Sequence, residues 1–334
     1  MGIKVLDCTL RDGGYVNNFN FGEENKIEIT NKLISAGIEI IEIGFLKNGN
    51  HYKDLTYYNK VSEAEKYITH NCINQKYCLM VRPDWYDINF LEPATEKIDC
   101  LRFAFHSRDM RLTLDQAGKA RDLGYSVFLN PVNITSYSEL ELEQLLITIN
   151  LFQPEAVSIV DTFGSLLPKQ FTKILDSFHD LLSPNITIGL HLHENLSFSM
   201  GIANQFLEKM FGVRNVIIDS SLLGMGRVPG NLCTELLTGW LNVEYGKKYQ
   251  QYEIIDVISS TIQPIRDKFI WGYLPMYAKT GFDKVHRDYA EYLMSNSDLS
   301  LIQIFEILER ISNAKAGNIF DENIAQKFIN NNYK

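Results

Sequence analysis

Two histidines, His191 and His193, stand two residues apart in the apolar stretch "ITIGLHLHENL", in a chain that has only seven histidines. If this stretch is a β-strand, the two side chains point to the same face, because alternate residues of a strand do so. Two neutral imidazoles together with one carboxylate are a common ligand set for a divalent cation. Such a set leaves coordination positions open, which is typical of a catalytic metal site.

A carboxylate that could complete this set lies near the N-terminus, in "LDCTLRDGG". Arg11 and Asp12 follow the first apolar run there, and we take Asp12 as the third ligand. The mixed nitrogen and oxygen donors suit Mn²⁺, which we favour, and also Mg²⁺, Zn²⁺ or Co²⁺. Each pattern alone has a simpler interpretation: a hydrogen-bonded pair of histidines, or a local ion pair at a strand end. The metal site therefore requires a fold that brings residue 12 beside residues 191 and 193.

The chain alternates between short β-branched runs and stretches with helical spacing of apolar residues. The expected strands are residues 4–10, 38–45, 76–82, 100–106, 126–132, 156–162, 186–192 and 216–222. Such alternation predicts an α/β fold with a parallel sheet, and the count of eight favours a (β/α)8 TIM barrel. An open doubly wound sheet is the alternative, but no glycine-rich dinucleotide loop follows the first strand.

The alternation stops near residue 245, and the remaining sequence has only helical patterns, such as "LSLIQIFEILERI". We therefore predict a TIM-barrel catalytic domain over residues 1–245 and a C-terminal all-helical domain over residues 246–334. No low-complexity linker separates the two, so the helical domain is expected to pack on the barrel.

Polar residues occur at the C-terminal ends of nearly all the expected strands. In a parallel barrel these ends open on one face, which is where active sites form. Candidates for substrate binding there are Glu42, Asn130, Asp161, Thr162, Gly226 and Asn231, with His106 as a candidate catalytic group. Individually these are ordinary features: a semi-buried histidine, a turn, a loop with a helix cap. Their shared position at one end of the barrel is what favours a site.

The composition is that of a globular protein, with 45% hydrophobic and 22% charged residues. The net charge of −9 argues against a broad nucleic-acid surface. No apolar run approaches the roughly 20 residues of a membrane helix. Five scattered cysteines predict reduced thiols, and hence a cytoplasmic protein.

Five motifs, in this order, resemble the DRE-TIM metallolyases, the HMG-CoA lyase-like superfamily of metal-dependent aldolases and acyl lyases. They are "LDCTLRDGG", "IEIIEIGF", "VDTFG", "HLHEN" and "GMGRVPGN". Within that superfamily, the segment "WGYLPMYAKTGFDKVHRDYAEYL" is most similar to the C-terminal domain of 4-hydroxy-2-oxovalerate aldolases. The resemblance covers most of the chain.

The resemblance implies that Asp12, His191 and His193 bind the divalent cation, whose shell a 2-oxo acid completes with its carboxylate and keto oxygens. It also implies that Arg11 lies beside the keto oxygen. There it stabilises the enolate formed when the carbon–carbon bond breaks, since a guanidinium and a metal act where negative charge develops.

Two further groups follow from the same resemblance. Family aldolases bring a tyrosine from the C-terminal domain, for which we choose Tyr277, with Tyr273 as the alternative; a packing role is an equally simple interpretation. Gly226, Gly230 and Asn231 would line the site near a helix N-terminus, where backbone N–H groups favour an anionic group.

The chain departs from the family pattern at residue 15. The resembling aldolases have a histidine three residues after the metal aspartate, as the base for the hydroxyl proton, whereas this chain has Tyr15. A phenol with a pKa near 10 is a poor base at neutral pH, so a metal-bound water or His106 takes this role, or the substrate differs. HMG-CoA lyase has a cysteine in the glycine-rich loop, but here Cys233 lies beyond "GMGRVPGN".

These features predict an enzyme, a carbon–carbon lyase: a divalent-metal-dependent aldolase that reversibly cleaves a 4-hydroxy-2-oxo acid. The products would be pyruvate, or a related 2-oxo acid, and an aldehyde. Two alternatives stay open: a Claisen-type synthase that joins an acyl-CoA to a 2-oxo acid, resembling isopropylmalate synthase, and a non-catalytic binding or partner subunit. Expected partners are the small-molecule substrates and an aldehyde dehydrogenase or a second copy of the chain, with no nucleic acid and no membrane.

Overall fold

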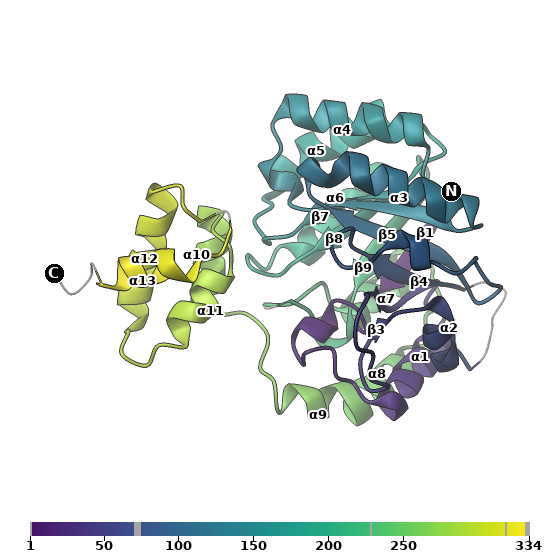
Figure 1. The fold of residues 1–334 in the computed structure, drawn as a ribbon, viewed down its shortest axis with the longest axis horizontal. Helices are drawn as coiled ribbons and strands as arrows, with labels where there is room; N and C mark the ends of the chain where they lie inside the picture. Colours follow the sequence, from purple (N-terminus) through teal and green to yellow (C-terminus); the bar gives the residue numbers. More distant parts are fainter. Residues whose placement is uncertain (1, 70–74, 228, 318, 331–334) are drawn as a thin grey trace.

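Eight parallel strands close into a barrel in the computed structural model, which describes residues 2–69, 75–227, 229–317 and 319–330 (Figure 1). The barrel strands are β1 (Ile3–Asp7), β2 (Ile40–Leu46), β4 (Lys76–Val81), β5 (Ile98–Phe105), β6 (Ser126–Pro131), β7 (Ala156–Asp161), β8 (Thr187–Leu192) and β9 (Val216–Ser220). A two-residue strand, β3 (Tyr57–Tyr58), adds to the edge of β2. All eight predicted strands are present, which confirms the (β/α)8 TIM barrel.

Helices on the outside of the barrel cover the strands. They are α1 (Glu23–Ala36), α2 (Val61–Ala64), α3 (Met110–Asp122), α4 (Glu139–Phe152), α5 (Pro168–Leu181), α6 (Ser199–Met210) and α7 (Thr234–Tyr245). Local signals set several of their ends: Ser138 and Glu141 form a capping box at the start of α4, and Gly37 ends α1 at φ 83°. Between β4 and β5 the chain forms only a short 3₁₀ turn, Ile88–Phe90, where the sequence lacks helical periodicity.

Closure of the sheet brings the two ends of the barrel sequence together. Strand β1 pairs with β2 on one side, with Leu6 opposite Ile40, and with β9 on the other, with Ile3 opposite Val216. Because β9 also pairs with β8, only one strand separates β1 from β8. The residues that follow β1 therefore lie near the C-terminal end of β8.

Two hydrophobic clusters build the barrel. The larger lies between the sheet and the helices, and the smaller fills the barrel interior with side chains that alternate along the strands with those of the first. The smaller cluster consists of Leu6, Cys8, Ile40, Cys78, Cys100, Phe128, Ala156 and Ile217. The four cysteines in the described part of the chain, Cys8, Cys78, Cys100 and Cys233, are free thiols.

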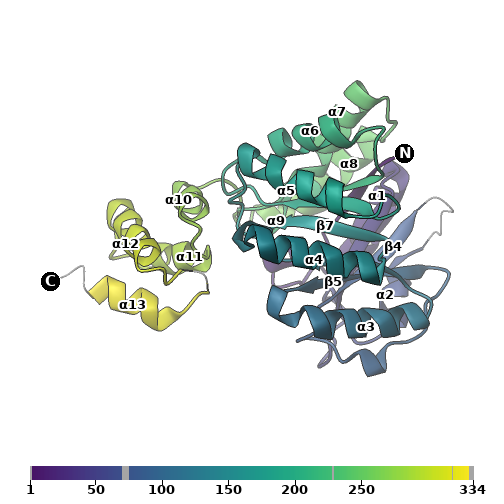
Figure 2. The same cartoon turned by 90° about the horizontal axis from the view of Figure 1, so that it is seen from above.

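Four C-terminal helices form a separate unit at one end of the barrel (Figures 1 and 2). They are α10 (Pro275–Asp283), α11 (Asp288–Met294), α12 (Leu301–Asn313) and α13 (Glu322–Asn330), and they pack around their own apolar cluster. The two helices before them, α8 (Gln251–Val257) and α9 (Gln263–Arg266), belong to the barrel, because Ile254 and Val257 of α8 pack in its cluster and Ile265 of α9 packs against it. The two cores divide the chain between Trp271 and Met276, after the expected boundary at residue 246. None of the described helices is both long and apolar enough to span a membrane.

Gly44 is required by the backbone of β2. Its φ is +153°, the pairing register shifts between Glu42 and Gly44, and a Cβ at residue 44 would lie 2.2 Å from the carbonyl oxygen of Thr56. We expect Gly44→Ala to lower the free energy of unfolding by at least about 2 kcal/mol, since strain and overpacking add. Urea unfolding measures this change.

Gly118 in α3 provides the matched control. A Cβ there meets no atom within 4 Å, so Gly118→Ala should raise the free energy of unfolding by up to about 1 kcal/mol through helix propensity. Equal stability of Gly44→Ala and the native chain would contradict the role assigned to Gly44.

Candidate active site

Asp12, His191 and His193 meet at the C-terminal mouth of the barrel. Their ligand atoms all lie within 4.8 Å of one another, and all three side chains are buried. Asp12 comes from the turn after β1, whereas the two histidines come from the end of β8. The fold thus brings together the three residues that the sequence pattern selected as a ligand set.

Both kinds of ligand are in the protonation state that a cation requires. Burial lowers the pKa of His193 to about 3, despite the neighbouring carboxylate of Asp12, so this imidazole is neutral near pH 7. Burial opposes ionisation of Asp12, but Arg11 and the two imidazoles outweigh it and hold the pKa of Asp12 below its usual range. A neutral imidazole and an ionised carboxylate offer free lone pairs to a metal.

The loop after β9 packs its backbone against the carboxylate of Asp12. Asn231 Nδ2 donates to Asp12 Oδ2 at 2.8 Å, and the backbone N–H of Arg227 donates to the same oxygen at 3.3 Å. A Cβ on Gly226 would lie 2.9 Å from Asp12 Oδ2, so this position requires glycine. Asn231 Oδ1 is buried and has no hydrogen-bond partner in the described part of the chain. The imidazole nitrogens of His191 and His193 and the carboxylate oxygens of Asp12 are ligands that suit a divalent cation.

A chain of charged hydrogen bonds runs through the barrel interior from Asp12 to His191. Its six members are Asp12, Arg11, Glu42, Arg102, Asp219 and His191. Arg11 contacts Asp12 Oδ1 at 2.5 Å and Glu42 Oε2 at 2.6 Å. Arg102 donates to Glu42 Oε2 at 3.0 Å and to Asp219 Oδ2 at 2.5 Å. Each buried charge in the chain thus has a partner of opposite sign, as burial requires.

Asp219 orients the imidazole of His191. Its Oδ2 lies 3.0 Å from His191 Nδ1, and we assign the donated proton to Nδ1 because an ionised carboxylate can only accept. Burial opposes ionisation of Asp219, but Arg102 and His191 keep its pKa below the usual range. Nε2 of His191 is then the free ligand atom, which is how carboxylates orient metal-binding histidines.

Sequence reasoning missed Arg102 and Asp219. Both stand inside apolar strands, in "CLRFAFH" and "VIIDSSL", and a charge in the middle of a buried strand is a signal that could have identified them. Glu42 was selected for substrate binding, but it lies beneath Arg11 in the charged chain and does not line the cavity.

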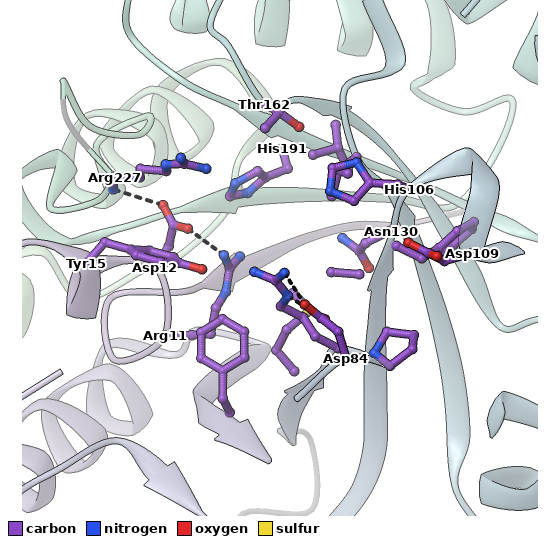
Figure 3. Close-up of a pocket in the computed structure, with 18 of the residues that line it drawn as sticks. Arg11, Asp12, Tyr15, Asp84, His106, Asp109, Asn130, Thr162, His191 and Arg227 are labelled. Carbon is purple, nitrogen blue, oxygen red and sulfur yellow. Dashed lines mark hydrogen bonds and ion pairs between the residues drawn. The ribbon is translucent and has the colours of Figure 1, made fainter. Parts of the chain in front are cut away.

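A cavity of about 290 Å³ opens beside the ligand set (Figure 3). The sequence-selected residues that line it are Arg11, Asp12, Tyr15, His106, Asn130, Thr162, His191 and His193. It is also lined by charged residues that were not selected, namely Arg82, Asp84, Arg108, Asp109 and Arg227. Of these, Arg82 ends an expected strand and Arg227 lies in "GMGRVPGN", so position along the chain could have indicated both.

Two selected residues have structural partners away from the cavity. The carboxylate of Asp161 accepts hydrogen bonds from the backbone N–H groups of Ser165 and Leu166, at 2.9 and 3.0 Å. Burial raises its pKa to about 6 against these bonds. Tyr277 is buried in the core of the C-terminal unit, where its phenol hydrogen-bonds with Glu291, and the alternative Tyr273 is mostly exposed.

The C-terminal unit contacts Arg227, a residue of the loop after β9 that lines the cavity. The Nη2 atom of Arg227 lies 3.1 Å from His286 Nε2 and 3.6 Å from Asp288 Oδ1, and the His286 ring packs edge-on against Phe163. Asn195 donates to the carbonyl oxygen of Tyr277 at 3.3 Å. The helical unit therefore contacts the same loops that hold the ligand set.

Tyr15 and His106 line opposite parts of the cavity. The ring of Tyr15 packs edge-on against Phe19 and Phe45, at centroid distances of 4.9 and 6.3 Å, and its hydroxyl hydrogen-bonds with Arg82. Burial, followed by the guanidinium groups of Arg108 and Arg82, lowers the pKa of His106 below 6.5. The imidazole of His106 is thus neutral at pH 7 and able to accept a proton.

The model of the HMGL-like family matches residues 2–259. The chain belongs to this family. It is 27% identical over 274 residues to a 4-hydroxy-2-oxovalerate aldolase of Geobacillus genomosp. 3, covering 79% of this chain and 78% of that protein. An enzyme of the same name from Bacillus cereus is 27% identical over 291 residues, covering 83% of each chain.

The fold is also that of a solved structure, the N-terminal domain of a candidate aldolase from Bacteroides vulgatus. The two superpose with a TM-score of 0.75 at 23% identity, covering 90% of this chain and 99% of that one. The family match and the named relatives confirm the predicted resemblance to the HMG-CoA lyase-like superfamily and to 4-hydroxy-2-oxovalerate aldolases.

The charged chain gives a stability prediction. Arg102→Met should lower the free energy of unfolding by about 3–5 kcal/mol, because it leaves the buried carboxylate of Asp219 without its guanidinium partner and Glu42 with Arg11 alone. Arg111→Met, on the exposed face of α3, is the matched control and should change stability by no more than about 0.5 kcal/mol. Chemical denaturation of both variants tests this, and similar stabilities would show that the buried ion pairs contribute little.

Proposed function

We propose that this chain is a divalent-metal-dependent aldolase. It would cleave a 4-hydroxy-2-oxo acid reversibly into pyruvate, or a related 2-oxo acid, and an aldehyde. The observation that carries the proposal is the group of Asp12, His191 and His193 at one wall of a cavity, with Arg11 bonded to the same aspartate. The aldolase names of the relatives support the reaction class.

Asp12, His191 and His193 would hold the cation, Mn²⁺ in our preferred assignment. When bound, the cation supplies Lewis-acid polarisation of a 2-oxo acid. Arg11 lines the same cavity with its guanidinium held by Asp12 and Glu42, so it is rigid before substrate binds. A fixed guanidinium aimed at the keto oxygen stabilises the negative charge of the enolate that forms as the C3–C4 bond breaks.

Cleavage also needs a base for the C4 hydroxyl proton. The hydroxyl oxygen becomes the carbonyl oxygen of the aldehyde, while the electron pair of the C3–C4 bond passes to the enolate. We assign the base to His106, because its neutral imidazole lines the cavity and is a better base at neutral pH than the phenol of Tyr15. Tyr15 is then a hydrogen-bonding group for a substrate oxygen.

The first test replaces a proposed ligand. Asp12→Ala and His191→Ala should lose bound Mn²⁺, and with it the exchange of pyruvate methyl protons in D₂O, which reports enolate formation. Metal content by mass spectrometry and exchange by NMR measure the two effects. Asp122→Ala, at the exposed C-terminal end of α3, carries the same change and should retain both properties. Full exchange in Asp12→Ala would remove the mechanism.

Two further measurements distinguish the aldolase from the alternatives that the sequence leaves open. Thiol release from an acyl-CoA in the presence of a 2-oxo acid would identify a Claisen-type synthase. Bound metal without exchange or turnover would identify a non-catalytic subunit. The aldehyde dehydrogenase partner, the homodimer and the cytoplasmic location stay predictions.

The second test concerns pH. A base acts in its neutral form, and burial together with the guanidinium groups of Arg108 and Arg82 lowers the pKa of His106. The rate of cleavage should therefore be constant around neutral pH and fall in acid, with a midpoint below that of an unperturbed histidine. His106→Asn should lower kcat by about 100-fold or more and remove this acid limb. An unchanged limb in His106→Asn would assign the base to another group.

A further inference from the structure

The walls of the cavity differ in chemistry on its two sides. In the closed barrel, β1, β9 and β8 carry the ligand set, and the strands opposite them are β6, β5 and β4. The C-terminal ends of these three strands and the loops that follow them present six polar residues to the cavity, which we call the acceptor side: Arg82, Asp84, His106, Arg108, Asp109 and Asn130. Figure 3 shows His106, Asn130, Asp84 and Asp109 across the cavity from Asp12 and Arg227.

Asn130 is the buried member of the acceptor side. Its side chain is about 97% buried at the end of β6, and its Oδ1 has no hydrogen-bond partner. Its Nδ2 donates no hydrogen bond within the described residues and is not among the buried unpaired atoms, so this N–H₂ group faces the cavity that Asn130 lines. An oxygen of a bound ligand, such as a hydroxyl, would accept a hydrogen bond from it.

The charges on the acceptor side are already balanced in pairs. Arg82 binds Asp84 through two contacts, at 3.0 and 2.7 Å, and Arg108 lies 3.6 Å from Asp109. Each guanidinium is therefore already paired with a carboxylate, and an anionic ligand would have to compete with that carboxylate. Each pair instead displays N–H donors next to carboxylate acceptors, and the neutral ring of His106 adds one of each. This mixed arrangement matches hydroxyl groups.

We propose that the acceptor side binds a hydroxylated aldehyde, a short aldose without a charged group, as the second partner of the aldol reaction. This inference rests on the proposed aldolase function. In the condensation direction, C3 of the enolate forms a bond with the carbonyl carbon of the aldehyde, and the carbonyl oxygen takes up a proton to become the C4 hydroxyl. The hydroxyls on the remaining carbons of the aldehyde would hydrogen-bond with Asn130 and the Arg–Asp pairs.

An apolar aldehyde of the same length would leave the amide of Asn130 buried and unpaired. Sites built to hydrogen-bond a hydroxyl reject analogues that lack it, because of such unpaired groups. The apolar wall formed by Phe45, Met80 and Ala104 can still contact the carbon-bound hydrogens of the chain. The preference should therefore depend on the hydroxyls.

The experiment measures kcat/KM for condensation of pyruvate with propanal, lactaldehyde, glyceraldehyde and glyceraldehyde 3-phosphate, using the Mn²⁺-loaded full chain. The first three share a three-carbon chain and add hydroxyls one at a time. We expect glyceraldehyde to exceed propanal by at least about tenfold and the phosphorylated form to bring no gain. Propanal as good as glyceraldehyde, or a tenfold preference for the phosphate, would overturn the proposal.

The role of Asn130 is tested by the ratio of the two rates. In Asn130→Leu the ratio of glyceraldehyde to propanal should fall by at least about threefold, because the leucine gains nothing from a hydroxyl while the Arg–Asp pairs remain. Asn204→Leu, on α6 away from the cavity, should keep the native ratio. An unchanged ratio in Asn130→Leu would overturn the assignment.

Exchange of pyruvate methyl protons in D₂O without an aldehyde tests the aldolase function separately from the choice of aldehyde. Exchange by the native chain without a preference for hydroxylated acceptors refutes the acceptor inference alone. Absence of exchange refutes the aldolase function on which it rests.

Discussion

The carboxylate of Asp12 and the imidazole of His191 are the two ends of one chain of charged hydrogen bonds inside the barrel. Desolvation makes every member of such a chain unfavourable unless its neighbour of opposite charge is in place. Arg102, among the largest fully buried side chains of the molecule, joins the two halves by contacting both Glu42 and Asp219. The positions of Asp12 and His191 therefore depend on the same ion pairs that stabilise the barrel interior.

Barrel closure is what completes this chain. Glu42 comes from β2 and Arg11 follows β1, so their contact exists only because β1 pairs with β2. The bulge at Gly44 shifts the register directly after Glu42. A backbone conformation that favours glycine thus lies two residues from the carboxylate that holds Arg11.

The cavity has two walls of different composition. One wall carries Arg11, Asp12, His191 and His193, which come from the motifs on which the family resemblance rests, and the family match covers them. The other wall carries the Arg–Asp pairs around Asn130. Our two proposals divide between these walls, with enolate formation assigned to the first and the choice of aldehyde to the second.

The sequence by itself determined the eight strands, the helical tail and the ligand candidates, because alternating periodicity and histidine spacing are local properties of the chain. It also indicated Asn130, His106 and Thr162, since a polar residue at a barrel strand end has one direction to face. Only the tertiary structure decided that Glu42 supports Arg11, that Asp161 binds its own turn, and that Tyr277 lies in a separate core. Arg102 and Asp219 also needed the fold: their partners are distant in sequence, and ion pairing across a closed barrel leaves no periodic trace in the chain.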